Sequence, residues 1–221
     1  MKGVLHFLPA CLLTAFLIFD GNCFAADPAA PPVKKLTAWY DIPVPDPIAW
    51  KEVETFPGTK EEPRVHIAVI SGGKWRSEIR TANHSNAVVY VFDGAKQSSN
   101  LPFYDIAIAQ RIKGAPNVDD PRNGLRGHLQ TSMNNRPEGT ERVNGKICSR
   151  YIVPHNGFTS RLWLDSGTHF PLVTEWESTA PPAHFYRSVY TLLDPAGLVR
   201  RDPNVFNANG PKPVFLDLLV P

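Results

Sequence analysis

The stretch Thr140–Ser178, TERVNGKICSRYIVPHNGFTSRLWLDSGTHFPLVTEWES, decides the fold because its short alternating segments are separated by turn-forming residues. Asn144-Gly145 and Asn156-Gly157 supply the positive φ angles that tight hairpin turns require. Asp165-Ser166-Gly167 and the proline-containing segment 180–182 mark the next two connections. These signals predict an antiparallel meander with strands at Thr140–Val143, Lys146–Val153, Phe158–Asp165, His169–Ser178 and His184–Leu193.

One face of this meander is expected to be apolar, because side chains alternate between the two faces of a strand. An apolar face of this extent has to be covered, and few other elements are available to cover it. The pattern therefore predicts a mainly β fold, with a minor helical part, in which a strongly curved antiparallel sheet forms a half-barrel. The residues expected on its concave face are Ile147, Tyr151, Val153, Phe158, Leu162, Leu164, Leu172, Trp176, Phe185, Val189 and Leu193.

A short helix is expected over Pro121–Met133 and is the candidate cover for the concave face. Asp120 fits an N-cap that is followed by proline at the first helical position. Leu125, Leu129 and Met133 then form an apolar stripe at a spacing of four residues. Each of the two glycines inside the helix weakens it by about 1 kcal/mol relative to alanine. The helix therefore depends on packing and is a candidate moving part.

The first half of the chain contains further strand patterns, at Arg64–Ser71, Trp75–Thr81 and Ala87–Phe92. The last of these is apolar on both faces, which is typical of a central strand covered on both sides. In the middle strand, one face carries Trp75, Ser77 and Ile79, whereas the other carries Arg76, Glu78 and Arg80 and is expected to face solvent. The segment 103–113 fits neither the helical nor the strand period well, so its structure stays open.

The N-terminus has the pattern of a secretory signal peptide over residues 1–25. Lys2 precedes the apolar run Val4–Phe19, and small residues in Cys23-Phe24-Ala25 predict cleavage after Ala25. No second apolar run long enough to span a membrane follows, so we expect an exported, periplasmic protein without a transmembrane segment. Residues 26–50 are rich in proline and read as an extended arm, and residues 51–221 as one domain.

Several function classes are disfavoured by composition and spacing. The formal net charge is +2, without a basic stripe, so nucleic acid is not an expected partner. Cys148 is the one cysteine after residue 25 and is expected to be a buried strand residue. The histidines lack the spacing of metal ligands, so no metal or cofactor is expected. Local catalytic motifs are missing, and a hydrolase would need a serine, a histidine and an acid brought together in space from separate strands.

The second half of the chain resembles the outer-membrane lipoprotein-sorting (LolA-like) superfamily and its periplasmic relatives. The similarity rests on Asn144-Gly145-Lys146-Ile147-Cys148 with Tyr151, on Leu162-Trp163-Leu164-Asp165, and on Phe170-Pro171-Leu172 with Glu175. Phe92-Asp93-Gly94 and Asp202-Pro203-Asn204-Val205-Phe206 fit as well. The resemblance implies a half-barrel of antiparallel strands with helices over an apolar concave face, and a non-enzymatic role in binding acyl chains or a lipoprotein. The carriers' ligand-gating arginine has Arg64 as its nearest counterpart, with Arg76 and Arg80 as alternatives.

The expected function is therefore the binding of a lipid-like or other apolar ligand, or a lipoprotein, in the concave face, without catalysis. A sensor or protein-interaction module of the envelope, with its cavity filled by its own side chains, is the alternative. No catalytic or metal-binding residue is expected. The candidate ligand-binding residues are Trp75, Ile79, Tyr151, Leu162, Trp176 and Val189 on the sheet and Leu129 on the helix.

Overall fold

The computed structural model describes residues 42–81, 87–101, 106–110, 119–178 and 183–208. The chain divides into two compact units, Met1–Leu36 and Thr37–Pro221, and all described residues belong to the second. The signal peptide and residues 26–41 of the proline-rich arm lie outside the described residues.

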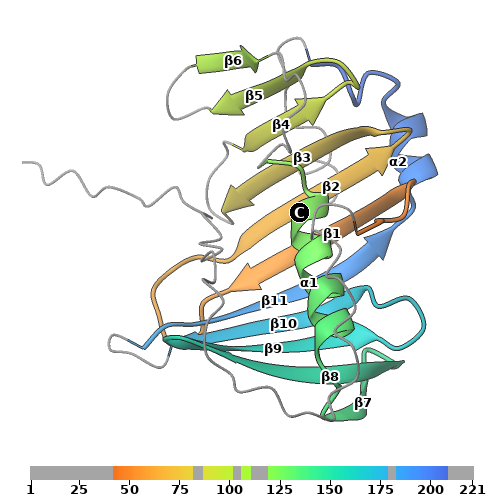
Figure 1. Cartoon of the computed structure of the whole chain (residues 1–221). Helices are drawn as coiled ribbons and strands as arrows, with labels where there is room; N and C mark the ends of the chain where they lie inside the picture. The colour runs from red at the N-terminus through yellow and green to blue at the C-terminus, as the bar shows by residue number, and fades with distance from the viewer. Residues whose placement is uncertain (1–41, 82–86, 102–105, 111–118, 179–182, 209–221) are drawn as a thin grey trace, which may run out of the picture. The chain divides into compact units, whose positions relative to one another are not determined.

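A single antiparallel sheet of eleven strands forms the body of this unit, and it is open, with β6 and β7 at its edges (Figure 1). The strands follow one another in space in the order β6-β5-β4-β3-β2-β1-β11-β10-β9-β8-β7. Their bounds are β1 Ile48–Thr55, β2 Arg64–Ser71, β3 Lys74–Thr81, β4 Val88–Phe92, β5 Gln97–Leu101, β6 Ile106–Gln110, β7 Gly139–Val143, β8 Lys146–His155, β9 Phe158–Asp165, β10 Pro171–Ser178 and β11 Phe185–Leu193. The two helices are α1 Arg122–Asn134 and α2 Pro195–Arg201. The predicted mainly β fold, a curved antiparallel sheet with a short helix over one face, is confirmed.

The pairing of β1 with β11 joins two meanders, one running from β1 to β6 and the other from β7 to β11. Trp50 lies opposite Leu192 and Glu52 opposite Tyr190 across this pair. On its other side β1 pairs with β2, with Glu52 opposite His66. Because paired residues of an antiparallel ladder share a face, this register places Glu52, His66 and Tyr190 on one face at the centre of the sheet.

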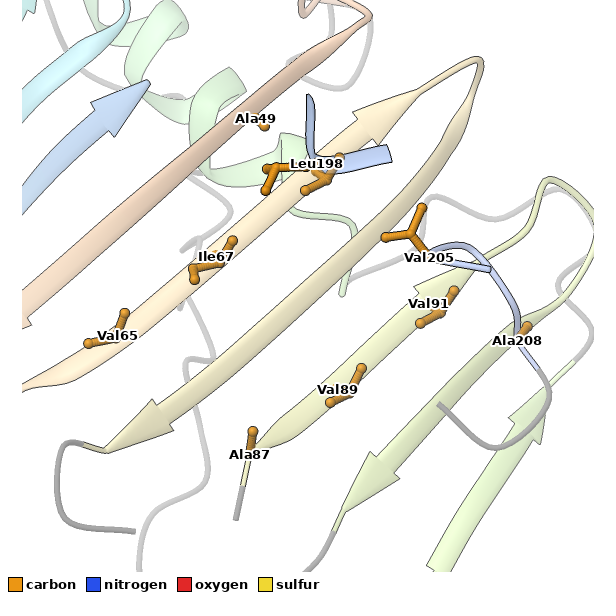
Figure 2. Packing of buried hydrophobic residues seen from close by; sticks show 10 residues of the cluster. Ala49, Val65, Ile67, Ala87, Val89, Val91, Leu198, Val205 and Ala208 are labelled. Atoms are coloured by element: carbon orange, nitrogen blue, oxygen red, sulfur yellow. The ribbon is translucent and has the colours of Figure 1, made fainter. Parts of the chain in front are cut away.

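The two faces of the sheet are covered differently, and we call them the α1 face and the α2 face. Leu125 of α1 packs on one of them, in a buried cluster with Ile48, Trp50, Ala68, Ile70, Trp75, Cys148, Phe170, Leu172 and Tyr190. Leu198 of α2, with Val205 and Ala208 beyond it, packs on the other face, as Figure 2 shows. The sheet residues of that second cluster are Ala49, Val65, Ile67, Val69, Ala87, Val89 and Val91. The chain therefore buries both faces over its central strands.

One expected alternation is wrong. Trp176 lies opposite Tyr186, and Val189 lies opposite Val173. The even-numbered residues of β11 therefore share the face of Trp176 and Leu162, whereas Phe185, Val189 and Leu193 point to the α2 face. Both alternations of β11 contain large side chains, so its apolar residues alone did not reveal the register.

The expectation that Arg76, Glu78 and Arg80 form a solvated face is wrong for Arg76 and Glu78, which are 2% and 0% exposed. Arg76 Nε donates to Glu78 Oε1 at 2.6 Å and Arg76 Nη1 donates to the carbonyl of Val205 at 2.9 Å. The segment 202–208 therefore covers these charges, and a buried charge remains tolerable only when it is paired in this way.

Some elements were not anticipated from the sequence. β1 begins at Ile48, and Trp50 is 2% exposed, so the last residues assigned to the proline-rich arm belong to the packed domain. The short α2 follows Asp194, whose side chain accepts from Ala196 N at its N-terminus. The aspartate-proline pair that predicted α1 occurs there as well and would have located α2. The open segment 103–113 contains β6.

The expected strand pairs of the second meander are all present, with strand ends within a few residues of the predicted ones, and the predicted connection at 180–182 lies outside the described residues. Asn144 and Gly145 have φ angles of 49° and 81°, as the two-residue turn requires. Cys148 is a free thiol and fully buried, which confirms the structural interpretation of this residue.

We predict that Gly145→Val destabilises the protein by more than about 1 kcal/mol, because a β-branched residue adopts a positive φ only with strain. Gly139→Val is the matched control in the same hairpin, since Gly139 has no positive φ and open space around its α-carbon. Chemical denaturation of both variants measures the difference. Equal losses of stability in the two variants would contradict the turn geometry.

Candidate functional site

Leu125 is the one fully buried side chain of the helix α1. Leu125 is 4% exposed, whereas Leu129 is half-buried and Met133 is 66% exposed, so the apolar stripe is in full contact only near its start. Arg126 Nε donates to the carbonyl of Ile42 at 3.2 Å. Asp120 lies one residue before the N-cap position, which Pro121 occupies, and its side chain accepts a hydrogen bond from Arg122 N at 3.0 Å. A helix with this little burial opens at a low free-energy cost.

The predicted ligand-binding residues are distributed unevenly. Trp75, Ile79, Tyr151, Leu162 and Trp176 all point to the α1 face, and Leu129 comes from α1 itself. Val189 lies on the α2 face. Trp75 is 1% exposed and Tyr151 and Leu162 are each 3% exposed, so side chains of the chain itself cover them in this conformation. Access to them requires a displacement of the cover.

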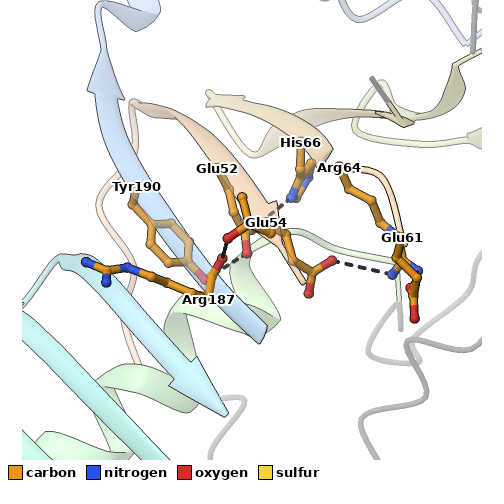
Figure 3. A network of polar contacts seen from close by, with 8 residues as sticks. Glu52, Glu54, Glu61, Arg64, His66, Arg187 and Tyr190 are labelled. Atoms are coloured by element: carbon orange, nitrogen blue, oxygen red, sulfur yellow. Dashed lines mark hydrogen bonds and ion pairs between the residues drawn. The ribbon is translucent and has the colours of Figure 1, made fainter. Parts of the chain in front are cut away.

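A polar cluster lies at the centre of the α1 face, among the apolar residues just described. Glu52 Oε2 lies 3.4 Å from His66 Nδ1, and His66 Nε2 lies 2.8 Å from Ser77 Oγ. Tyr190 Oη donates to Glu52 Oε1 at 3.0 Å and lies 3.5 Å from His128 Nε2, on α1. Figure 3 shows Glu52 between His66 and Tyr190. These residues, Glu52, His66, Ser77, His128 and Tyr190, are called the central cluster below.

Burial and hydrogen bonding set the charge states of the central cluster. Burial alone would raise the pKa of Glu52, but hydrogen bonding and attraction from His66, with hydrogen bonds from Ser188 and Tyr190, bring it below its ordinary value. Burial lowers the pKa of His128 to about 4, against a smaller opposing effect of Glu52. Burial and the nearby Glu52 charge raise the pKa of Tyr190 well above 10. At neutral pH the cluster therefore holds a carboxylate, a neutral His128 and a protonated Tyr190.

A row of aromatic rings crosses β8 to β11 on the same face. The ring centroids of His155 and Phe158 are 4.3 Å apart, those of Phe158 and Trp176 5.2 Å, and those of Trp176 and Tyr186 6.2 Å. Phe56 continues the row at 6.4 Å from Tyr186. Phe158, Trp176 and Tyr186 are only half-buried and His155 is exposed, so the row presents apolar ring edges to solvent.

The central cluster was not predicted, because its members come from β1, β2, β3, β11 and α1, which are far apart in the sequence. The strand register and the packing of α1 on the sheet bring them together. A weak signal was present: Ser77 lies between Trp75 and Ile79 on one face of its strand, and His66 directly precedes the buried run Ile67–Ile70.

Comparison with known proteins gives matches by structure. No protein-family model matches the chain, and no curated protein matches it by sequence. A LolA superfamily protein from Nitrosomonas europaea matches 66% of this chain and 84% of its own, with 10% identity and a TM-score of 0.31. A putative outer-membrane lipoprotein-sorting protein domain from Vibrio parahaemolyticus matches 71% of this chain and 85% of its own length, with 11% identity and a TM-score of 0.28.

MucB, in its complex with MucA from Pseudomonas aeruginosa, matches 67% of this chain with 17% identity and a TM-score of 0.39. This chain spans about half the length of that protein, 52%. Proteins described as LolA-like or lipoprotein-sorting are among the solved structures that match. These matches concern the fold alone.

Among the described residues, no three His, Cys, Asp or Glu side chains converge as a metal site. Within the same part of the chain, no helix is both long and apolar enough to cross a bilayer.

The lowered pKa of His128 predicts a pH dependence of stability. A folded-state pKa of about 4, below the ordinary 6.5, means that folding favours the neutral ring. The contribution of the neutral His128 to the free energy of unfolding is complete above pH 6.5 and is lost as the pH falls from about 6.5 toward about 4. His128→Phe keeps an aromatic ring against Tyr190 and removes this titration, so the variant should gain stability relative to wild type between pH 7 and pH 5. Urea unfolding at several pH values measures this, and parallel stability curves would contradict it.

Proposed function

We propose that this protein is a periplasmic binding protein of the LolA-like kind that takes up an acyl chain or another apolar ligand, free or on a lipoprotein, between α1 and the α1 face of the sheet. The observation that carries the proposal is the asymmetry of α1. Leu125 fastens its first half to the sheet, while Leu129 is only half-buried and Met133 is exposed. An apolar ligand has an apolar surface to replace there, and α1 has little to lose by moving.

The chemistry of the α1 face supports this proposal. Trp75, Ile79, Leu162 and Trp176 provide aliphatic and aromatic surface, and the central cluster supplies a small number of placed polar groups. Ligand sites for apolar molecules commonly combine these two features. Because the face is covered in this conformation, the apparent affinity for a ligand is reduced by the fraction of molecules with α1 displaced.

The aromatic row favours a second candidate function, the binding of a protein partner in the envelope with the α1 face permanently filled. Aromatic side chains are enriched at protein interfaces, and Phe158, Trp176 and Tyr186 remain half-exposed. The two candidates differ in one measurable respect, which is the uptake of an apolar small molecule.

Titration of a fluorescent fatty acid into the mature protein tests the first candidate. Leu129→Asp should raise the rates of uptake and release by loosening α1, while the sheet remains folded. Met133→Asp, the same change in the same stripe, should leave the rates unaltered because Met133 is exposed. Leu162→Trp should weaken binding, whereas Val189→Phe, on the α2 face, should cost comparable stability, about 1–3 kcal/mol, without weakening it.

Thermal melts of the same samples separate binding from folding. Saturable uptake by wild type, altered in Leu129→Asp and Leu162→Trp and preserved in the two controls, is the expected result. If wild type takes up no probe and every substitution on the α1 face only lowers the melting temperature, the ligand-binding proposal fails and the protein-partner function replaces it.

A further inference from the structure

We propose that Ser77, His66 and Glu52 form a nucleophile, base and acid relay that accepts an acyl group from an ester of the apolar ligand bound under α1. Ser77 Oγ lies 2.8 Å from His66 Nε2, and His66 Nδ1 lies 3.4 Å from Glu52 Oε2. A nucleophile next to a base that a third group orients is recognised by this geometry, whatever the order of the residues in the chain. The inference rests on the proposed ligand site and assigns chemistry to it.

The strand register holds the relay in place. Glu52 on β1 lies directly opposite His66 on β2. On β3, Ile79 lies opposite His66, and Ser77 is the next residue along on the same face, so Ser77 approaches His66 diagonally. All three residues stand on central strands that are paired on both sides, which fixes their spacing more rigidly than loops would.

The surroundings of His66 select the arrangement that a proton relay needs. Tyr190 Oη donates to Glu52 Oε1, which turns the other carboxylate oxygen, Oε2, toward His66 Nδ1. With a proton on Nδ1 facing this carboxylate, Nε2 carries the lone pair that accepts the Ser77 hydroxyl proton. Trp50 packs edge-on against the imidazole at a ring separation of 6.2 Å.

The chemical step is acyl transfer. Ser77 Oγ attacks the ester carbonyl carbon while its proton passes to His66 Nε2, and Glu52 stabilises the resulting imidazolium. The ester carbon–oxygen bond breaks, and the alcohol leaves with the proton from His66. A water molecule, deprotonated by His66, then attacks the acyl-serine. The acid is released and the proton returns to Ser77, so no other reactant is needed.

Substrate class and rate follow from the position of Ser77. Ser77 is 3% exposed and lies between Trp75 and Ile79 on the same face of β3, so the expected substrate is an ester with an apolar acyl chain. Leu125 of α1 packs in one cluster with Trp75 and with Ala68, which lies opposite Ser77, so access requires displacement of α1. β3 is paired with β2 and β4 around Ser77, so its backbone N–H groups are engaged in the ladders and supply no oxyanion hole. Losing one such donor typically costs about 10²–10³-fold in rate, so we expect slow covalent capture.

An alkyl fluorophosphonate, which forms a stable bond with a nucleophilic serine, is the probe for this test. The mature protein is incubated with it, intact mass gives the extent of labelling, and peptide mapping gives the site. Displacement of the fluorescent fatty acid by the same probe reports non-covalent binding separately. Leu129→Asp is included so that access under α1 does not limit the reaction.

We expect one label per chain on Ser77, faster in Leu129→Asp, absent in Ser77→Ala and at least about tenfold slower in His66→Asn and Glu52→Gln. Ser160→Ala is the matched control, because Ser160 is also a buried serine on the α1 face, 2% exposed, and its Oγ has no hydrogen-bond partner among the described residues. The Ser160→Ala variant should be labelled on Ser77 to the same extent as wild type. Ser77→Ala removes one oxygen atom from a sheet position, and its melting temperature shows whether the fold is kept.

Each outcome decides the proposal. Displacement of the fatty acid without labelling of Ser77, in wild type and in Leu129→Asp alike, overturns the relay and leaves the ligand-binding function intact. Labelling at another residue, or equal labelling of His66→Asn and wild type, overturns it as well. Absence of both displacement and labelling overturns the relay together with the ligand-binding function.

Discussion

The pairing of β1 with β11 is the constraint on which the rest of the structure depends. It joins residues near opposite ends of the domain and turns two separate meanders into one continuous sheet. A one-residue shift in this pairing would exchange the faces of the two halves. The α1 face, the α2 face and the central cluster all exist only in the observed register, in which Glu52 lies between His66 and Tyr190.

The two faces are covered by different kinds of contact. On the α2 face, the segment 202–208 covers the buried pair Arg76–Glu78 and accepts a hydrogen bond from Arg76, so this cover is bound through charged groups that are costly to expose. On the α1 face, the attachment of α1 rests on the packing of Leu125 and on polar contacts of Arg126 and His128. Because of this difference, we propose α1 as the cover that moves and the α2 face as a permanent core.

The sequence predicted what local rules determine. Asn144-Gly145, the alternation of β3 and of β8 to β10, and the stripe from Leu125 to Met133 gave the meander, the helix and five of the sheet residues now found on the α1 face. It missed what depends on pairing between distant segments. Val189 was assigned to the wrong face because β11 carries large side chains on both, and Arg76 and Glu78 were expected in solvent because their cover arrives more than a hundred residues later. The central cluster has the same origin, since separate strands assemble it.

The central claim is that an apolar ligand binds by displacing α1 from the sheet. Hydrogen–deuterium exchange, followed by mass spectrometry with and without a saturating long-chain fatty acid, tests it most directly. In the free protein the amides of α1 should exchange much faster than those of β1 and β2, and the fatty acid should change exchange in α1 and leave α2 unaltered. Exchange in α1 as slow as in β1, with no response to the fatty acid, would contradict the account.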